Sequence, residues 1–351
     1  MRALTLRPDT RGSLRVEDVP DPEPGPGELL VQGLALGICG TDRELASGEY
    51  GFWRGEKDSM ILGHESLGRV LRAPEGSSFS PGDLVVGVVR RPDPVPCPAC
   101  ARGEFDMCRN GRYTERGIKA LDGFGSELWT VEEDYAVRID PRLERVGVLM
   151  EPTSIVAKAW EHIERIGARA WFEPRTALVV GAGPIGLLAA LLGTQRGLEV
   201  HVVDRTTEEL KPDLVRSLGA VFHSGSSLEP VRDLRPDIIV EATGAGTMVL
   251  DSMVMSGSAG IVCLTGVSAP GKVLDADVGR INRDMVLEND VVFGSVNANL
   301  RHFRAAGDAL AAADGAWLER LITRRLPLER APEAFEKPGD DVKLVIDLTT
   351  G

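Results

Sequence analysis

The sequence predicts an α/β protein of two domains, in which an irregular β domain is combined with a doubly wound parallel sheet. The chain has 351 residues, and a single core stops growing at about 250–300 residues. Residues 1 to about 150 contain short β-type runs between turns, whereas helical and strand-like stretches alternate from there to 296. The tail resumes a mixed character. We therefore assign residues 1–156 and 297–351 to one domain and 157–296 to the other.

The first part of the chain is predicted to contain many short strands. β-type runs cover 29–31, 68–71 and 83–89. Turn signals separate them, with Pro and Gly alternating over 24–27 and a Pro-Gly-Asp turn at 81–83. Short runs between such turns are typical of an irregular β domain.

From about residue 150 the pattern changes to alternating helices and buried strands. A helix is predicted over 154–166, and the continuous apolar run at 177–180 indicates a strand that is buried on both faces. Further strands are predicted at 200–203, 237–241, 260–264, 291–296 and 343–348, and further helices at 186–194, 208–218 and 247–256. The alternation up to residue 296 predicts a doubly wound parallel sheet.

Charge and cysteine content exclude several classes of function. With 40 Lys and Arg against 53 Asp and Glu, the formal net charge is −13, which argues against nucleic-acid and anionic-membrane partners. The N-terminus lacks the apolar region of a secretory signal, and the apolar stretch at 177–193 is broken by glycines and Pro184, whereas a membrane span needs roughly 20 apolar residues. Five sparse cysteines indicate metal or thiol chemistry in the cytoplasm rather than a disulfide framework.

The segment Gly181-Ala-Gly183-Pro184-Ile185-Gly186 predicts a turn that binds a dinucleotide. It lies between a predicted strand and a predicted helix. There Gly181 permits the tight turn, Gly183 admits the pyrophosphate and Gly186 permits close packing. The start of the helix, at Pro184 and Ile185, offers free N–H groups to the phosphates.

Asp204 and Arg205, at the end of the next predicted strand, bear on the choice of cofactor. A carboxylate at this position holds the ribose 2′-hydroxyl of NAD and repels a 2′-phosphate. Arg205 could instead bind that phosphate. We expect NAD as the cofactor and keep NADP as the alternative.

Cys39, His64 and Glu151 predict a catalytic zinc site. Cys39 and His64 each lie in a glycine-flanked motif, and Glu151 directly precedes the dinucleotide-binding domain. They supply one sulfur, one nitrogen and one oxygen ligand, and a catalytic zinc keeps its remaining position open. Glu65 could enter the coordination sphere, and Asp42 could accept the other ring N–H of His64. Taken singly, the cysteine would be interpreted as a small buried apolar residue.

A second cluster, Cys97, Cys100 and Cys108, predicts a structural zinc site. Cys97 and Cys100 have the spacing of paired thiolate ligands, and Cys108 follows shortly after. Three ligands are therefore apparent in this segment. A metal-free lobe with free thiols is the alternative.

The motifs at 37–42, 63–68 and 181–186 resemble those of the zinc-containing medium-chain dehydrogenases. They are Gly-Ile-Cys-Gly-Thr-Asp, Gly-His-Glu-Ser-Leu-Gly and Gly-Ala-Gly-Pro-Ile-Gly, and the resemblance covers essentially the whole chain. It implies a GroES-like β domain that carries zinc and a Rossmann domain that carries the cofactor.

Four further segments resemble the glucose (aldose) dehydrogenase branch of that family. They are 40–44, 115–118 with 122–124, Glu151-Pro152, and 296–297 with 302–303. The resemblance implies an oxidoreductase that takes hydride from the C1 hydroxyl of an aldose such as glucose, gives the lactone and reduces NAD(P)⁺. The alternative is a zinc-dependent polyol or amino-cyclitol dehydrogenase. A non-catalytic relative is disfavoured, because such relatives usually lose metal ligands.

The resemblance also implies roles for individual residues. Thr41, His64 and Glu65 are the implied catalytic residues, and Thr41 is the implied first proton carrier. The implied substrate contacts are Thr41, Glu115, Glu151 and Asn297, and Asn297 is also an implied cofactor contact.

Three positions depart from the family pattern. A fourth cysteine is usual where this chain has Pro94, whose side chain cannot ligate, so the neighbouring Asp93 is expected as the fourth ligand of the structural zinc. Val89 and Lys119 leave the identity of the sugar open. Relatives commonly form homodimers or homotetramers through a sheet edge, for which 291–296 is the expected strand.

Overall fold

The computed structural model describes residues 1–8, 10–48, 58–206, 208–268, 271, 273–336 and 341–349. The chain divides into two compact units, Met1–Ser154 with Asn297–Gly351, and Ile155–Val296. We call them unit 1 and unit 2. The division falls within helix α2 (Met150–Gly167), at 154/155 where the sequence suggested 156/157.

Helix α2 begins at Met150, earlier than the expected residue 154. Pro152 does not prevent this start, because it lies in the first helical turn. The N–H groups of that turn have no partner within the helix, so a missing N–H costs little there.

Unit 1 is built mainly from β-strands, as the sequence predicted. Its largest sheet has the order β11-β6-β5-β3-β19-β18, with β10 also paired to β3. Two three-stranded sheets accompany it, β2-β1-β4 and β7-β8-β9. The strands are β1 (Arg2–Leu6), β2 (Arg15–Asp18), β3 (Glu28–Ile38), β4 (Met60–Ile61), β5 (Glu65–Arg72), β6 (Leu84–Gly87), β7 (Arg90–Arg91), β8 (Thr114–Arg116), β9 (Ala120–Leu121), β10 (Leu128–Glu132), β11 (Ala136–Arg138), β18 (Ile322–Pro327) and β19 (Lys343–Asp347).

Short helices complete unit 1 within the described ranges. They are α1 (Gly40–Ser47), α7 (Leu300–Ala311), α8 (Gly315–Leu321) and α9 (Glu333–Glu336). Helix α7 begins at the N-cap Asn299, whose side chain accepts from the N–H of Arg301. In this tail the strand predicted at 343–348 is confirmed as β19, whereas helices α7, α8 and α9 were not predicted.

Three neighbouring strands of unit 1 bring distant residues to one edge of the large sheet. Strand β3 is antiparallel to both β5 and β19, with Gly37 opposite Glu65 and Ile38 opposite Leu344. The end of β3 therefore lies beside the beginnings of β5 and β19. Each of these strand ends carries a polar residue of the site described below.

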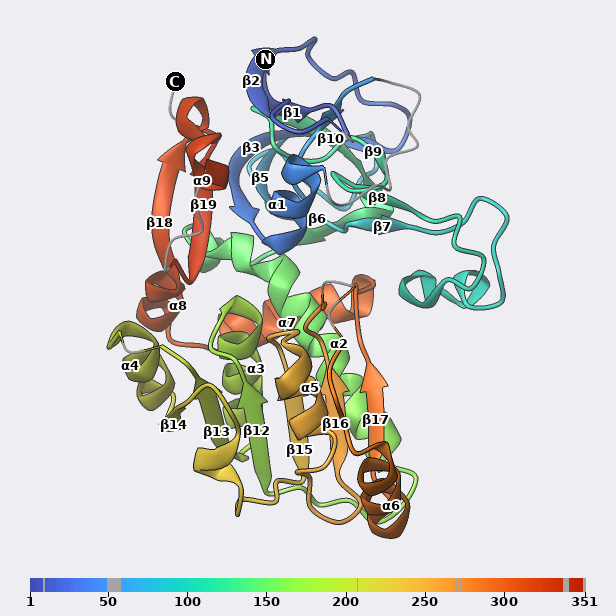
Figure 1. Ribbon diagram of the computed structural model, residues 1–351. Helices are drawn as coiled ribbons and strands as arrows, with labels where there is room; N and C mark the ends of the chain where they lie inside the picture. Colours follow the sequence, from blue (N-terminus) through green and yellow to red (C-terminus); the bar gives the residue numbers. More distant parts are fainter. Residues whose placement is uncertain are drawn as a thin grey trace. The chain divides into compact units, whose positions relative to one another are not determined.

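Unit 2 contains the doubly wound parallel sheet that the sequence predicted. Its strands run side by side in the order β14-β13-β12-β15-β16-β17, and all neighbouring pairs are parallel (Figure 1). The order reverses between β12 and β15, which is where such sheets bind ligands. The strands are β12 (Thr176–Val180), β13 (Glu199–Asp204), β14 (Val221–Ser224), β15 (Ile238–Glu241), β16 (Ile261–Leu264) and β17 (Val291–Gly294).

Helices and strands alternate along unit 2 as predicted, apart from two elements. The helices are α2, α3 (Pro184–Gln195), α4 (Leu210–Ser217), α5 (Gly246–Ser252) and α6 (Val278–Glu288). Helix α6 and strand β14 were not predicted. In α6 no residue is buried, and β14 is a short edge strand that contains a histidine, so neither has the continuous apolar pattern of a core element.

The strands of this sheet are buried on both faces, and one hydrophobic cluster lies on one of them. Leu178, Val180, Val203, Ile239 and Val262 pack together there from successive strands. Among the described residues, no helix combines the length and the apolar character that crossing a bilayer would require.

Candidate active site

Cys39 and His64 lie side by side at the edge of the large sheet of unit 1. Cys39 follows β3 and caps helix α1, and its N–H donates to Oδ2 of Asp42 at 2.9 Å. Its Sγ lies 3.2 Å from Nε2 of His64. The other ring nitrogen of His64, Nδ1, lies 3.2 Å from Oδ1 of the fully buried Asp42. Asp42 therefore orients the imidazole so that Nε2 faces the cysteine, as the sequence suggested.

Close packing of glycines holds the turn that presents His64. Gly63 has φ +99°, which is the left-handed region that favours glycine. Gly117 and Gly123 pack against it so closely that a Cβ atom on either would lie within 2.4 Å of the carbonyl oxygen of Gly63. The turn is thereby fixed from both sides.

Glu65 joins Cys39 and His64 in a cluster of three potential metal ligands. Their ligand atoms lie within 4.8 Å of one another. The carboxylate of Glu65 also contacts Nζ of Lys343, which donates to the carbonyl of Ile38 at 3.2 Å. Both side chains of this ion pair are 2% exposed. A thiol, an imidazole and a carboxylate this close together are a donor set that suits zinc.

Glu151 lies outside this cluster but close to it. It occupies the first turn of α2. Burial raises the pKa of Glu151 to about 7, and the charges of His64, Glu65 and Lys343 also act on it. The structure thus brings Glu65 together with Cys39 and His64, whereas the sequence analysis had ranked Glu151 before Glu65.

The charges around His64 favour a bound cation. Burial opposes protonation of His64, but the neighbouring Cys39 and Asp42 outweigh it and raise the pKa of His64 well above its ordinary value. A group that stabilises positive charge on an imidazole also stabilises a metal ion in the same place.

Thr41 lies in the first turn of α1, half-buried.

Glu115 and Asn297 meet although they are far apart in the sequence. Nδ2 of Asn297 donates to Oε1 of Glu115 at 2.6 Å. The same oxygen accepts from Nε and Nη2 of Arg90 at 3.0 and 2.9 Å. Asn297 has φ +62°, an uncommon conformation that asparagine tolerates. Arg90 was not assigned a role from the sequence, although a pair of arginines directly after the apolar run at 83–89 was a usable signal.

Val89 and Lys119, two of the three departures from the family pattern, occupy different environments. Val89 is buried, with 3% of its surface exposed. Nζ of Lys119 donates to the carbonyl of Gly111 at 2.6 Å and lies over the ring of Tyr113. Lys119 is therefore already engaged in local contacts.

Cys97, Cys100 and Cys108 form the second cluster of potential metal ligands. Their Sγ atoms lie within 4.8 Å of one another. The N–H groups of Arg109 and Cys100 donate to Sγ of Cys97 and lower the pKa of Cys97 to about 6. Burial raises the pKa of Cys100 to about 11. A thiolate surrounded by N–H donors fits a structural zinc.

The structure does not bring Asp93 into this cluster. One carboxylate oxygen of Asp93 accepts from the N–H of Val95 at 2.8 Å, and the other lies 3.3 Å from Nε of Arg112. These two contacts engage both oxygens of the expected fourth ligand.

The glycine-rich turn of unit 2 has the geometry that the sequence implied. Gly181 has φ +100° and follows β12, Gly183 caps helix α3, and Pro184 is the first helical residue. A Cβ on Gly186 would lie 1.8 Å from the carbonyl oxygen of Gly181, whereas a Cβ on Gly183 would meet nothing within 4 Å. The close approach of Gly181 and Gly186 packs the strand against the helix. Gly183 leaves open space where a phosphate can approach.

Asp204 is engaged with the same turn. At the end of β13, its Oδ2 accepts from the N–H of Ala182 at 2.7 Å and its Oδ1 from the N–H of Thr206 at 2.9 Å. Nζ of Lys211 lies 3.8 Å from Oδ1, a neighbour that the sequence analysis missed. Arg205 is exposed.

Two family models match the chain. The model described as Glucose dehydrogenase C-terminus matches residues 144–348, and the Alcohol dehydrogenase GroES-like domain matches residues 25–141. Together they cover both units.

Curated relatives and solved structures agree with these matches. The chain is 40% identical to the glucose 1-dehydrogenase of Methanocella arvoryzae, over 99% of both chains, and 39% identical to that of Thermoproteus tenax, over the full length of both. It matches the structure of Haloferax mediterranei glucose dehydrogenase in complex with NADP, Zn and gluconolactone with a TM-score of 0.90 and 33% identity, over the whole of both chains.

Proposed function

Because the chain belongs to the glucose dehydrogenase family of zinc-dependent alcohol dehydrogenases, we propose that it oxidises the C1 hydroxyl of an aldose such as glucose to the lactone and passes the hydride to NAD(P)⁺. The chain is an oxidoreductase of this family. One observation carries the proposal most: the meeting of Cys39 with the buried His64 and Glu65. The NADP, Zn and gluconolactone in the Haloferax mediterranei structure support the substrate class.

Cys39 and His64 would hold the catalytic zinc, with Glu65 or Glu151 as the carboxylate ligand. When bound, the zinc supplies a Lewis acid for the substrate oxygen and the dinucleotide supplies the hydride acceptor. Asp42 keeps Nε2 of His64 directed at Cys39. The hydroxyl of Thr41, in the turn that follows Cys39, is the proposed first carrier of the substrate proton.

Glu115 and Asn297 would bind sugar hydroxyls. Arg90 holds the Glu115 carboxylate in place, so its remaining lone pairs keep one orientation. A site that hydrogen-bonds hydroxyls rejects analogues that lack them, because buried polar groups are then left unpaired. Thr41 and Glu151 are the other proposed sugar contacts.

The dinucleotide would bind at the turn of Gly181 to Gly186, with Ile185 in the first helical turn. We infer that Asp204 is a weaker barrier to NADP than its position suggests, because two N–H groups and Lys211 already offset its charge. Arg205 is then available to a 2′-phosphate. Asn297 is also a proposed cofactor contact, as the resemblance implies.

We further propose a cytosolic homodimer or homotetramer. The thiols of both cysteine clusters have to stay reduced to ligate. Strand β17 is an edge of its sheet, and helix α6 leaves Val278, Val286 and Leu287 at least 64% exposed. Exposed apolar residues on the helix that precedes an edge strand form a surface that a second copy would cover.

The deciding experiment follows NAD(P)H absorbance with a panel of aldoses, acyclic polyols and amino-cyclitols. We expect aldoses to be oxidised with the highest kcat/KM, and preferred oxidation of an acyclic polyol would contradict the aldose assignment.

Cys39→Ser should lose zinc and most turnover, whereas Cys263→Ser, at a buried cysteine of unit 2, should keep both. Glu115→Ala should raise the KM for the sugar more than the KM for the cofactor.

A further inference from the structure

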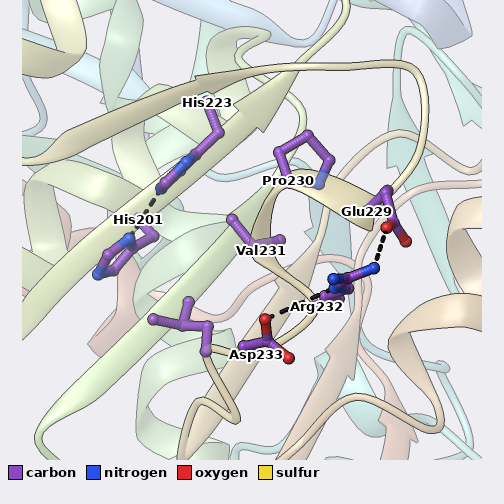
Figure 2. Close-up of a pocket in the computed structure, with 8 residues that line it drawn as sticks. His201, His223, Glu229, Pro230, Val231, Arg232 and Asp233 are labelled. Atoms are coloured by element: carbon purple, nitrogen blue, oxygen red, sulfur yellow. Dashed lines mark hydrogen bonds and ion pairs between the residues drawn. The ribbon is translucent and has the colours of Figure 1, made fainter.

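Unit 2 has a pocket on its sheet that is lined on one side by two histidines. His201 on β13 and His223 on β14 lie on the same sheet face, because Val203, two positions after His201, pairs with His223. The facing wall is the segment 229–234 (Figure 2), and the pocket has a volume of about 440 Å³. His201 precedes Asp204 in β13, so the pocket lies toward the opposite strand end from the glycine-rich turn.

The two imidazoles face each other with a carboxylate behind them. Nδ1 of His201 lies 2.9 Å from Nε2 of His223. On its other side, Nε2 of His201 lies 3.1 Å from Oε1 of Glu199. A carboxylate only accepts, so the His201 proton is on Nε2, and the lone pair of Nδ1 is directed at His223.

This arrangement matches the way in which proteins prepare histidine ligands for metals. A metal-ligating histidine donates its second ring N–H to a carboxylate, which fixes the tautomer and raises the basicity of the ligating nitrogen. Imidazole nitrogens suit zinc, copper and nickel, with bond lengths of about 2.0–2.1 Å for zinc. Two nitrogens 2.9 Å apart need only a small rotation to share one ion.

We propose that His201 and His223 bind a divalent transition metal ion, separately from both cysteine-containing clusters. Nδ1 of His201 and Nε2 of His223 are the ligands, Glu199 orients His201, and water completes the coordination. In forming the site, His223 moves its proton from Nε2 to Nδ1.

The surroundings favour a cation and keep the ligands neutral. Glu229 and Asp233 on the facing wall are offset by the single charge of Arg232, and Glu199 adds a further carboxylate. The pocket is therefore acidic on balance. Burial and the imidazole of His201 lower the pKa of His223, so the ring is unprotonated at neutral pH, as a ligand must be.

The test is a titration of the tag-free, zinc-loaded enzyme with NiCl2, followed by calorimetry and by metal analysis after dialysis. The parent should bind one equivalent of nickel that His201→Phe and His223→Phe lack. Glu199→Ala should weaken binding by up to about 10-fold. His162→Phe, at a histidine of α2 in the same unit, is the matched control and should bind as the parent does.

Sugar oxidation and the melting temperature monitor folding in each variant. His201 and His223 take no part in the proposed chemistry, so both variants should turn over sugar at the parental rate. Equal nickel binding in the parent and in both histidine variants would overturn the proposal, as would a parent that binds none. Should His201→Phe fold poorly, His223→Phe, on the edge strand, decides alone.

Discussion

A single lysine offsets the negative charge gathered around Cys39. Burial lowers the pKa of Lys343, but Glu65 and Cys39 outweigh it, so the pKa is raised and the ammonium stays charged. Its contacts are the carboxylate of Glu65 and the carbonyl of Ile38. The only sign of this role in the sequence is a charged residue that opens an otherwise apolar strand.

Replacing Lys343 by methionine should expose the cost of this buried charge. The Glu65 carboxylate would lose its partner in a buried place, which typically destabilises a protein by about 3–5 kcal/mol. Urea unfolding of parent and Lys343→Met measures the loss. Adding Glu65→Gln to the variant should recover part of it, because no unpaired charge then remains. An unchanged unfolding free energy in Lys343→Met would refute this account.

Three strands of unit 1 are joined by one carboxylate. Glu132 on β10 accepts from Nη2 of Arg91 on β7 at 2.7 Å and lies 3.4 Å from Nη2 of Arg116 on β8. Strand β10 belongs to the large sheet, and β7 and β8 belong to a small one. Glu132 thereby ties the segment that carries Glu115 to the main sheet.

The strength of this tie should depend on pH in a stated window. Burial raises the pKa of Glu132, but Arg91 and Arg116 outweigh it and lower the pKa to about 2. A depressed pKa means that the stabilisation is complete above the unfolded value of about 4.3 and is lost as pH falls toward 2. The group is 39% exposed, so solvent limits the effect to about 1 kcal/mol.

Urea unfolding of parent and Glu132→Gln from neutral pH downward checks this prediction. The difference in unfolding free energy should be constant above about pH 5 and should shrink below it. A difference that stays constant through the acid range would show that the carboxylate charge contributes nothing.

The sequence predicted the order of helices and strands better than it predicted contacts between distant residues. The alternation of elements and the motifs around Cys39, His64 and Gly181 predicted the parallel sheet and the β unit, since both depend on local patterns. The contact of Asn297 with Glu115, 182 residues apart, was not predicted, because the resemblance implied only that both residues bind the substrate. Likewise, adjacency in sequence did not reveal the hydrogen bonds of Asp93 to Val95 and Arg112.

Self-association should fail when the apolar surface of α6 is charged. Val286→Asp with Leu287→Asp would place two carboxylates where a second copy would pack, and like charges would then face each other across a symmetric interface. Light scattering after gel filtration should show a smaller particle than the parent. Val95→Asp, at a comparably exposed valine of unit 1 (64%), should leave the size unchanged. A parent that is itself monomeric would contradict the proposed assembly.

Strand β19 also sets an order of events during synthesis. Chains grow from the N-terminus, and domains generally fold while translation continues. All of unit 2 is made before Lys343, whereas Cys39, His64 and Glu65 are made before unit 2 begins. The ligating groups are therefore synthesised before the lysine that offsets their negative charge. Their environment is complete only when β19 pairs with β3 and brings Lys343 to Glu65.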